Sequence, residues 1–555
     1  MRGLARQQLL LLALVGLGGR LGLPSVARAA DMGSSASSAI DWRPCSDGTV
    51  GIGGDGSAGI DCATLEVPLD HLHPGTERVP LALARVPALD PAHKIGSVFL
   101  NPGGPGATGV DLVLGGFGAE LAALLEGRFD INGFDPRGVG ASSGLRCFAD
   151  DGAEDAYFAG LPAFPYRSEL ERPYFERYTA LAGICAGAGQ AIVSHMSTAD
   201  VARDLDLLRR AVGDAKLTYL GFSYGSFLGE TYANLFPDKV RAIVIDGVLD
   251  PRRWTSGLQI LSDASGAQLE LDEFLRLCDE AGSGCAFSAR EGAAVRYRSL
   301  AARVRIQPVM LPDGTQLSYD VLIAQVVGAL YAPEAWASFA AWLDAAADVS
   351  LGREAAAATY LAARDALQGQ LRGPAAPARA IALDSELGTI CADAEFPTAL
   401  GDFHATAVSA AGALSLAARF WWPSAACSAW PSASARYAGP WTQRTSAPVL
   451  IVGNFFDGIT SYADAVATSH LMPGSRLLSY AGWGHTAFDR SSCVRGHVVD
   501  YLLDGSLPPA ATVCPVEANP FAGALPEFGA ARSNARALPR VGLPTPWLGG
   551  RATPR

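Results

Sequence analysis

Two segments of the sequence match the pattern Gly-x-Ser-x-Gly, which can lift a serine hydroxyl clear of the backbone on a sharp turn between a strand and a helix. One is "GFSYG" at 221–225 and the other is "GASSG" at 140–144. Ser223 follows an apolar segment and precedes "SFLGETYANLF", which has helical spacing. Ser142 lies in a glycine-rich loop with no helical pattern directly behind it. The context therefore selects Ser223 as the candidate nucleophile.

A serine hydroxyl becomes a good nucleophile only when a base takes its proton, so a histidine is needed. Of the eight histidines, His485 lies in the glycine-rich turn "SYAGWGHTAF", just after the last predicted strand. His470 and His497 lie within helical patterns and are predicted to be surface residues. His485 is therefore the candidate base.

The imidazole in turn needs a carboxylate that fixes its tautomer and stabilises its cation. Asp457 ends the predicted strand "PVLIVGNFFD" and is followed by Gly-Ile-Thr. We expect Thr460 or Ser461 to cap the next helix, which leaves the Asp457 side chain free to project outward. The sequence therefore favours Asp457 as the candidate acid.

Asp246, which ends "AIVID", is the alternative acid and lies one predicted strand earlier. If Asp457 is the acid, we expect Asp246 and Asp250 to organise the turn that leads out of their strand. The order nucleophile, acid, base along the chain (Ser223, Asp457, His485) is the one expected of α/β-hydrolases.

The tetrahedral intermediate of acyl transfer also needs hydrogen-bond donors for its oxyanion. One predicted donor is the backbone N–H of Tyr224, the residue after the nucleophile. The other is expected in "NPGGPG" at 101–106, where two adjacent glycines allow close approach of the backbone and the flanking prolines stiffen the loop. We choose Gly104, with Gly103 as the alternative.

The elements that must position these residues alternate between strand and helix. Between the predicted strands lie helical stretches such as 198–213, where Val201, Leu205 and Leu208 fall on one face and Thr198 or Ser197 caps the start. Nearly continuous apolar strands that alternate with helices indicate an α/β fold, a mostly parallel sheet covered on both faces. Strands are predicted at 62–69, 80–88, 96–104, 129–138, 217–223, 242–248, 448–457 and 475–482.

The alternation stops in a long alanine-rich region with helical patterns, and this region predicts a helical lid inserted after the sixth strand. Its tryptophans are interpreted as the core of that lid. The expected boundaries are a signal peptide at 1–29, the first part of the core at 30–250, the lid at 251–445, the second part of the core at 446–515, and an irregular tail rich in Pro, Ala and Arg at 516–555.

The first residues have the features of an export signal: the basic "MRGLARQQ", the apolar "LLLLALVGLGG" and the small-x-small site "ARA" at 27–29. Its removal takes away four arginines, which changes the formal charge from 43 − 55 = −12 to 39 − 55 = −16. An acidic chain argues against nucleic acid or an anionic membrane as partner. No later stretch is long and charge-free enough for a stable membrane anchor. The expected location is secreted or periplasmic.

Ten cysteines in an exported chain indicate disulfide bonds. Pairing each cysteine with its neighbour is the simplest arrangement, although spacing alone does not fix the connectivity. No cofactor is expected, and no metal either, since zinc-binding patterns are missing and "HLH" at 71–73 reads as a surface turn. The neighbour pairs are Cys45–Cys62, Cys147–Cys185, Cys278–Cys285, Cys391–Cys427 and Cys493–Cys514.

Several motifs together resemble one family. They are "LNPGGPG", "FDPRGVGASS", "LGFSYGSFLG", "VLIVGNFFDGIT", "GWGH" and "CVRGHVVDYLLDGSLPPAATVC". The chain resembles the bacterial exported tripeptidyl-aminopeptidases, relatives of the prolyl aminopeptidases within the α/β-hydrolases, over roughly residues 40 to 515. The resemblance implies a serine exopeptidase that removes short peptides from free N-termini, with Ser223, His485 and Asp457 in the roles given above.

An enzyme that recognises a free N-terminus must hold an ammonium group, which calls for a carboxylate. The predicted lid offers "ELGTICADAEFP" at 386–397, where Asp393 is our hypothesis for the amine anchor and Glu395 a second substrate-binding candidate. Two other functions remain open: a carboxylesterase or lipase with the same triad, and a hydrolase-like binding module without catalysis. The sequence leaves the oligomeric state open.

Overall fold

The computed structural model describes residues 40–45, 59–75, 77–188, 191–353, 355–372, 382–411, 416–521 and 523–524. The predicted signal peptide at 1–29 lies outside the described residues, as does the predicted tail apart from 516–521 and 523–524.

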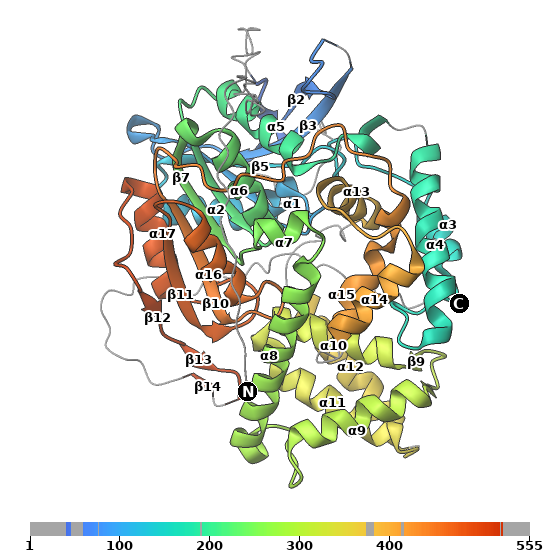
Figure 1. The fold of residues 1–555 in the computed structure, drawn as a ribbon. Helices are drawn as coiled ribbons and strands as arrows, with labels where there is room; N and C mark the ends of the chain where they lie inside the picture. Colours follow the sequence, from blue (N-terminus) through green and yellow to red (C-terminus); the bar gives the residue numbers. More distant parts are fainter. Residues whose placement is uncertain are drawn as a thin grey trace, which may run out of the picture. The chain divides into compact units, whose positions relative to one another are not determined.

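A ten-stranded sheet carries the fold, in the order β1-β2-β3-β5-β4-β6-β7-β10-β11-β12 (Figure 1). The pairs β1–β2, β2–β3 and β3–β5 are antiparallel, and the remaining neighbours are parallel. The predicted mostly parallel sheet is therefore confirmed, and β1 and β12 are short edge strands that the sequence pattern did not predict. The strands are β1 Arg43–Pro44, β2 Asp61–Pro68, β3 Arg78–Val86, β4 Gly96–Asn101, β5 Phe129–Phe134, β6 Leu217–Phe222, β7 Val240–Asp246, β10 Val449–Phe456, β11 Arg476–Trp483 and β12 Val513–Cys514.

The central strands are apolar along their whole length because both faces of the sheet are covered. In β7, Ile243 and Ile245 belong to one hydrophobic cluster and Val244 to another, as expected when alternate side chains point to opposite faces. The first cluster includes residues of α5 and α6, and the second includes residues of α1, α2 and α17. These helices are α1 Gly109–Leu114, α2 Phe117–Leu124, α5 Thr198–Ala211, α6 Tyr224–Leu235 and α17 Ser492–Asp504.

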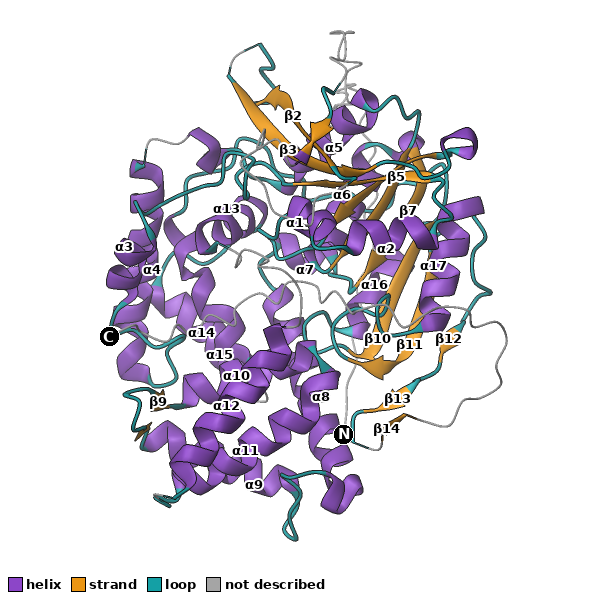
Figure 2. Cartoon of the chain, turned by 180° about the vertical axis from the view of Figure 1, so that it is seen from behind, coloured by secondary structure: helices purple, strands orange, loops and turns teal. Residues whose placement is uncertain are grey.

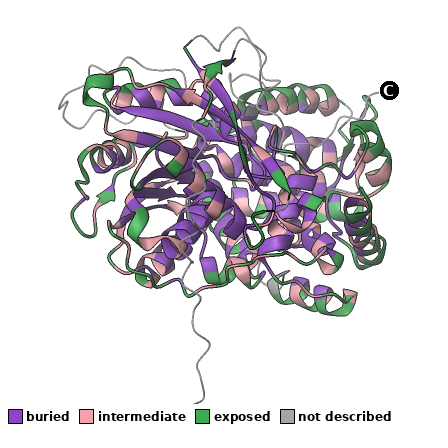
Figure 3. Ribbon diagram, turned by 90° about the horizontal axis from the view of Figure 1, so that it is seen from above, coloured by how far each residue is buried: buried purple, intermediate pink, exposed green. Residues whose placement is uncertain are grey.

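The predicted amphipathic helix at 198–213 corresponds to α5. Ser197 is its N-cap, since its side chain accepts from the N–H of Asp200. The predicted inward face, Val201, Leu205 and Leu208, is buried. Figure 3 shows this separation of buried and exposed faces across the protein, with buried residues along the strands and exposed residues on the outer sides of the helices.

Between β7 and β10 lies a helical insertion, residues 247–448, which interrupts the strand–helix alternation as predicted. Its described residues are helical apart from irregular connections and a small hairpin of Val309–Met310 (β8) and Gln316–Leu317 (β9) (Figure 2). Its α-helices are α7 Pro251–Thr255, α8 Gln259–Ala281, α9 Ala293–Ile306, α10 Tyr319–Tyr331, α11 Trp336–Ser350, α12 Ala356–Arg372, α13 Leu383–Asp393, α14 Leu400–Ala411 and α15 Ala417–Trp421.

Aromatic side chains form much of the core of this insertion. Trp336 and Trp422 are fully buried, and Phe274 contacts Trp336 edge-on. Helix α4 Ser168–Gly187, which precedes β6, joins this part of the protein, because its Tyr174 contacts Trp422. Helix α3 Asp151–Phe158 packs on α4, where Phe158 contacts Tyr178. Phe521 of the tail contacts Phe274, beside a short hairpin of Ala518–Asn519 (β13) and Gly523–Ala524 (β14) that the composition of the tail did not predict.

Within the described ranges, no single helix is long and apolar enough to cross a membrane. The segments Tyr319–Tyr331 and Pro333–Ser350 meet the length and composition criteria only as a pair, and they are bent by 118° against each other.

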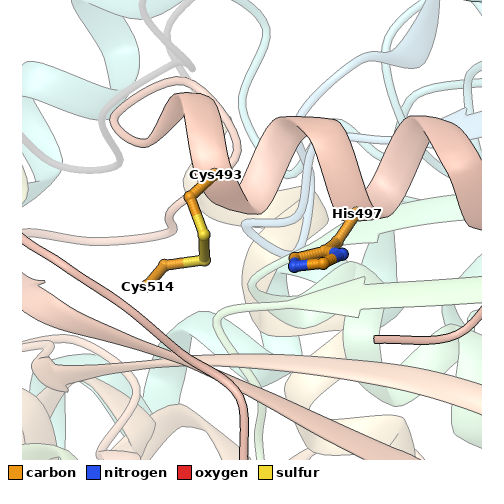
Figure 4. A group of neighbouring side chains, drawn as sticks. All are labelled: Cys493, His497 and Cys514. Carbon is orange, nitrogen blue, oxygen red and sulfur yellow. A yellow bond between two sulfur atoms is a disulfide. The ribbon is translucent and has the colours of Figure 1, made fainter. Parts of the chain in front are cut away.

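Five disulfide bonds join the same neighbouring cysteines that the sequence order suggested. The bond between Cys493 and Cys514 ties α17 to β12, with His497 nearby (Figure 4). These three residues are close enough to share a metal ion, as are Cys147, Cys185 and Asp384. In both groups the sulfur atoms are bonded to each other, so they offer no thiolate to a metal.

The prediction that "HLH" at 71–73 is a surface turn is right for the exposed His73 and wrong for His71. His71 is buried, and its Nε2 lies 2.8 Å from Oδ1 of Asp204. Arg137, also buried, contacts the same carboxylate with its Nε at 2.7 Å. A buried arginine needs such an ion pair. The sequence around His71 does not show that it takes part in this cluster, because Asp204 lies far away in the chain.

Candidate active site

Ser223 lies at the junction of β6 and α6 in a strained backbone conformation, φ 57° and ψ −125°, which is rare for a residue other than glycine. The flanking glycines make the turn possible. A Cβ at Gly221 would lie 2.5 Å from the carbonyl oxygen of Gly225, and a Cβ at Gly225 would lie 2.8 Å from that of Asn101. The pattern Gly-x-Ser-x-Gly is therefore required by close backbone contacts around the serine.

The second serine pattern has a structural role. Ser142 is buried, and its Oγ accepts from the N–H of Ala82 and donates to the carbonyl of Asp135, both at 2.7 Å. Both hydrogen bonds hold the hydroxyl within the fold, which agrees with the preference for Ser223.

The loop 101–106 packs its backbone directly against the Ser223 turn. A Cβ at Gly103 would lie 2.7 Å from the Cβ of Ser223 and 3.2 Å from the backbone nitrogen of Tyr224. Gly103 and Gly104 both have positive φ values, 100° and 102°. Tyr224 is the first residue of α6, so its N–H has no acceptor within the helix. The two predicted oxyanion donors thus come from segments that lie beside each other.

The candidate base and acid are in direct contact. Nδ1 of His485 lies 3.0 Å from both carboxylate oxygens of Asp457, and both side chains are buried. Asp457 also accepts from the N–H groups of Ile459 at 2.9 Å and Thr460 at 2.8 Å. Burial alone would raise the pKa of Asp457, but the charge and hydrogen bond of His485 and the two N–H groups lower it below its ordinary value. The carboxylate therefore remains ionised beside the imidazole. Ser461 caps the next helix, α16 Tyr462–Leu471.

The imidazole of His485 lies next to the backbone that supports Ser223. The N–H of Ser223 donates to the carbonyl of Asp246 at 2.9 Å, and a Cβ at Gly247 would lie 3.0 Å from Cε1 of His485. Nε2 of His485 is buried and has no hydrogen-bond partner in the described part of the chain, so it does not bond to the Ser223 hydroxyl in this conformation. In enzymes without substrate such catalytic hydrogen bonds are often long and tighten on binding.

Within the described part of the chain, Asp246, the alternative acid, makes no hydrogen bond to the imidazole. Its carboxylate accepts from the N–H of Ala487 at 3.0 and 3.1 Å and from that of Phe488 at 2.9 Å. The expectation that it organises the turn out of its own strand is therefore wrong, because its side chain points to the turn that carries His485. Asp250 does have the expected local role and caps α7 through the N–H of Arg252. Burial raises the pKa of Asp246 to about 7.

Two further residues shape the turn around His485, and our sequence reasoning missed both. The Asn454 side chain donates to the carbonyls of Gly484 at 2.7 Å and Thr486 at 2.8 Å. Tyr331 of the insertion contacts the imidazole edge-on, with ring centroids 5.2 Å apart. A polar residue in the otherwise apolar strand β10 was a signal for Asn454, whereas no sequence pattern pointed to Tyr331.

The substrate-binding candidates differ in their surroundings. Asp393 is buried; its Oδ1 accepts from the N–H of Thr198 at 2.7 Å, and its Oδ2 accepts from the hydroxyl of Thr198 at 2.6 Å and from Nε1 of Trp254 at 3.2 Å. The Thr198 hydroxyl also bonds to the Tyr224 hydroxyl, so Asp393 is linked to the residue beside Ser223. Burial raises the pKa of Asp393 to about 7. Glu395 is exposed and lies 3.3 Å from Arg436.

Two family models match the chain: residues 96–282 match the alpha/beta hydrolase fold, and residues 414–514 match TAP-like protein. Over 497 residues the chain is 31% identical to the serine protease Hip1 of Mycobacterium tuberculosis, covering 86% of this chain and 91% of that protein. The chain belongs to the TAP-like α/β-hydrolase family. The resemblance read from the motifs is thus confirmed.

Two other relatives carry different names. Carboxylesterase B of Mycobacterium tuberculosis is 32% identical over 474 residues, covering 82% of this chain and 86% of that protein. The tripeptidyl aminopeptidase of Streptomyces lividans is 28% identical over 515 residues, covering 88% of each. Membership of this family and the fold make the protein a serine hydrolase.

Replacing Asp457 with Asn should lower kcat by about 10⁴-fold, because an amide neither fixes the reactive tautomer nor stabilises the imidazolium. Hydrolysis of an activated substrate by the purified variant measures this loss. Asp246→Asn, which removes a carboxyl group near the same imidazole without direct contact, serves as the control and should lose far less. Similar losses in both variants would contradict the assignment of Asp457 as the acid.

The raised pKa of Asp246 predicts a pH effect on stability. Since its pKa rises from 3.8 to about 7 on folding, its favourable contribution is complete below about pH 3.8 and is lost as the pH rises through about 7. As the pH rises from about 3.8 to about 7, the free energy of unfolding of the wild-type protein should therefore decrease relative to that of Asp246→Asn. Urea unfolding of both proteins over a pH series measures it, and a constant difference would refute the prediction.

Proposed function

We propose that this protein is an exported serine exopeptidase that hydrolyses peptide bonds near free N-termini, as a tripeptidyl-aminopeptidase or another aminopeptidase. The observation that carries the proposal is the contact between His485 and Asp457 beside the strained Ser223 turn. The name of the relative from Streptomyces lividans supports a peptide substrate with a free N-terminus.

In this proposal the Ser223 oxygen attacks the scissile carbonyl carbon while Nε2 of His485 takes the hydroxyl proton. The N–H groups of Tyr224 and Gly104 stabilise the oxyanion of the tetrahedral intermediate. The imidazolium then gives its proton to the leaving amine, and the acyl-enzyme remains. Water attacks the ester with His485 again as base, which releases the N-terminal fragment and restores the serine. Asp457 stays ionised throughout and stabilises the imidazolium.

Five disulfide bonds fit an oxidising compartment outside the cytoplasm. We assign export to a signal peptide at residues 1–29, after which the mature enzyme is secreted or periplasmic. The helical insertion acts as a lid in this proposal, since Tyr331 lies against the base and the insertion supplies the candidate substrate-binding residues.

A carboxylesterase is the second candidate function, because one relative of similar identity is named carboxylesterase B. The proposed triad does not distinguish a peptidase from an esterase, since fold and triad do not select the acyl group. A preference for acyl esters over peptides with free N-termini would favour the esterase. A binding module without catalysis would leave Ser223 unreactive.

The purified protein should release short N-terminal fragments from unblocked peptides, and mass spectrometry of the products gives the number of residues removed. Ser223→Ala should abolish both this release and labelling by a fluorophosphonate, because both require the serine oxygen. Ser142→Ala is the matched control for the second serine pattern and should still be labelled. Cleavage of esters alone would overturn the peptidase proposal, and failure of the wild type to label would overturn the catalytic one.

If Asp393 anchors the substrate ammonium group, Asp393→Asn should raise KM for peptides with free N-termini and leave hydrolysis of N-acylated esters unchanged. The two substrates are compared on the same enzyme preparation, and Glu395→Gln tests the second candidate in the same way. An equal loss on both substrates would instead assign Asp393 to holding Thr198 and Tyr224 in place.

A further inference from the structure

Helix α8 of the insertion lies against the segment that follows the candidate acid. A Cβ at Gly266 of α8 would lie 2.7 Å from the carbonyl oxygen of Asp457 and 3.4 Å from the Cα of Ser461. This close approach places the next turn of α8, which carries Glu270, between the two segments that bear the acid and the base.

Glu270 contacts both of these segments. Its Oε1 accepts from the N–H of Gly484 at 2.7 Å, and a Cβ at Gly458 would lie only 2.4 Å from its Oε2. Gly484 directly precedes His485, and Gly458 directly follows Asp457. The Glu270 side chain is completely buried, so these contacts are not exchanged with solvent.

The charges around Glu270 favour its neutral form. Burial and the negative charge of Asp457 raise its pKa well above the ordinary value, against the opposing effects of the Gly484 and Gly458 N–H groups and the Arg490 guanidinium. The pKa of Asp457 is lowered by its contact with His485. Of two neighbouring buried carboxyl groups, the one that accepts fewer hydrogen bonds retains its proton more readily. Asp457 accepts from His485, Ile459 and Thr460, whereas Glu270 accepts from Gly484.

We propose that Glu270 is a positioning residue that holds the Asp457 and His485 segments at a fixed separation, and that it does so as a neutral carboxylic acid. This inference rests on the roles of Asp457 and His485 in the proposed function. A carboxyl group suits the task because one oxygen bonds to Gly484 while the other fills the space beside Gly458. Movement of α8 would then be transmitted directly to the acid–base pair.

Two substitutions separate position from charge. Glu270→Gln retains the shape, the acceptor oxygen and the neutral state. Glu270→Leu fills the volume but removes one of the two acceptors of the Gly484 N–H, which also donates to the carbonyl of Phe456 at 3.0 Å. Asp272→Asn is the matched control, since Asp272 lies on the same helix, is exposed and accepts from the side chain of Gln268 one turn earlier. All variants are tested as the full chain.

The first measurement is the rate of fluorophosphonate labelling of Ser223 as a function of pH, which does not depend on the substrate class. Glu270→Leu should label roughly 10- to 100-fold more slowly, because a small displacement of the acid–base pair has effects of this size. Glu270→Gln and Asp272→Asn should label at close to the wild-type rate with an unchanged pH midpoint. For the hydrolysed substrate, the Leu variant should lower kcat with little change in KM.

The second measurement is the downfield NMR resonance of the proton between His485 and Asp457. It should shift or broaden in Glu270→Leu and remain unchanged in Glu270→Gln.

A wild-type labelling rate and resonance in the Leu variant would overturn the positioning role. A changed pH midpoint in the Gln variant would overturn the neutral state, and this variant decides the question if the Leu variant does not fold. Failure of the wild type to label would refute the proposed function instead, and the NMR comparison would still test the role of Glu270.

Discussion

The register of the parallel strands at one edge of the sheet determines where the chemistry of this protein can occur. Phe222 of β6 pairs with Asp246 of β7, which in turn pairs with Val452 of β10, while Phe456 near the end of β10 pairs with Trp483 of β11. Parallel strands present their carboxyl ends at the same edge. The residues that follow these ends are the candidate nucleophile, acid and base, so strand pairing brings together segments that are far apart in the chain.

The buried carboxyl groups at this edge of the sheet differ in how readily they ionise. Three carboxyl groups, from Asp246, Asp457 and Glu270, surround the turns next to one imidazole. Only Asp457 contacts His485, and only its pKa is lowered; the other two are raised by burial, that of Asp246 to about 7. Several negative charges cannot be stabilised together in so small a buried volume. Both Asp246 and Glu270 accept hydrogen bonds from the backbone of the turn that carries His485.

The helical insertion is part of this arrangement and not only a cover for it. Tyr331 lies against the imidazole and accepts with its carbonyl from the Arg490 guanidinium at 2.7 Å. Asp393 joins α13 to the start of α5 and, through Thr198, to Tyr224. Glu270 bonds to the residue before His485. Each contact connects a helix of the insertion to an element that carries part of the candidate site, so the position of the insertion and the geometry of the site depend on each other.

The sequence by itself determined the α/β fold, most strands of the sheet and the candidate residues Ser223, Asp457 and His485, because hydrophobic periodicity and glycine spacing are local properties of the chain. Only the tertiary structure decided what Asp246, His71 and Glu270 do. The role of each depends on a partner more than a hundred positions away, with separations of 241, 133 and 214 residues for their hydrogen bonds. A buried polar side chain takes its function from the groups that folding places around it, and local sequence carries no record of those groups.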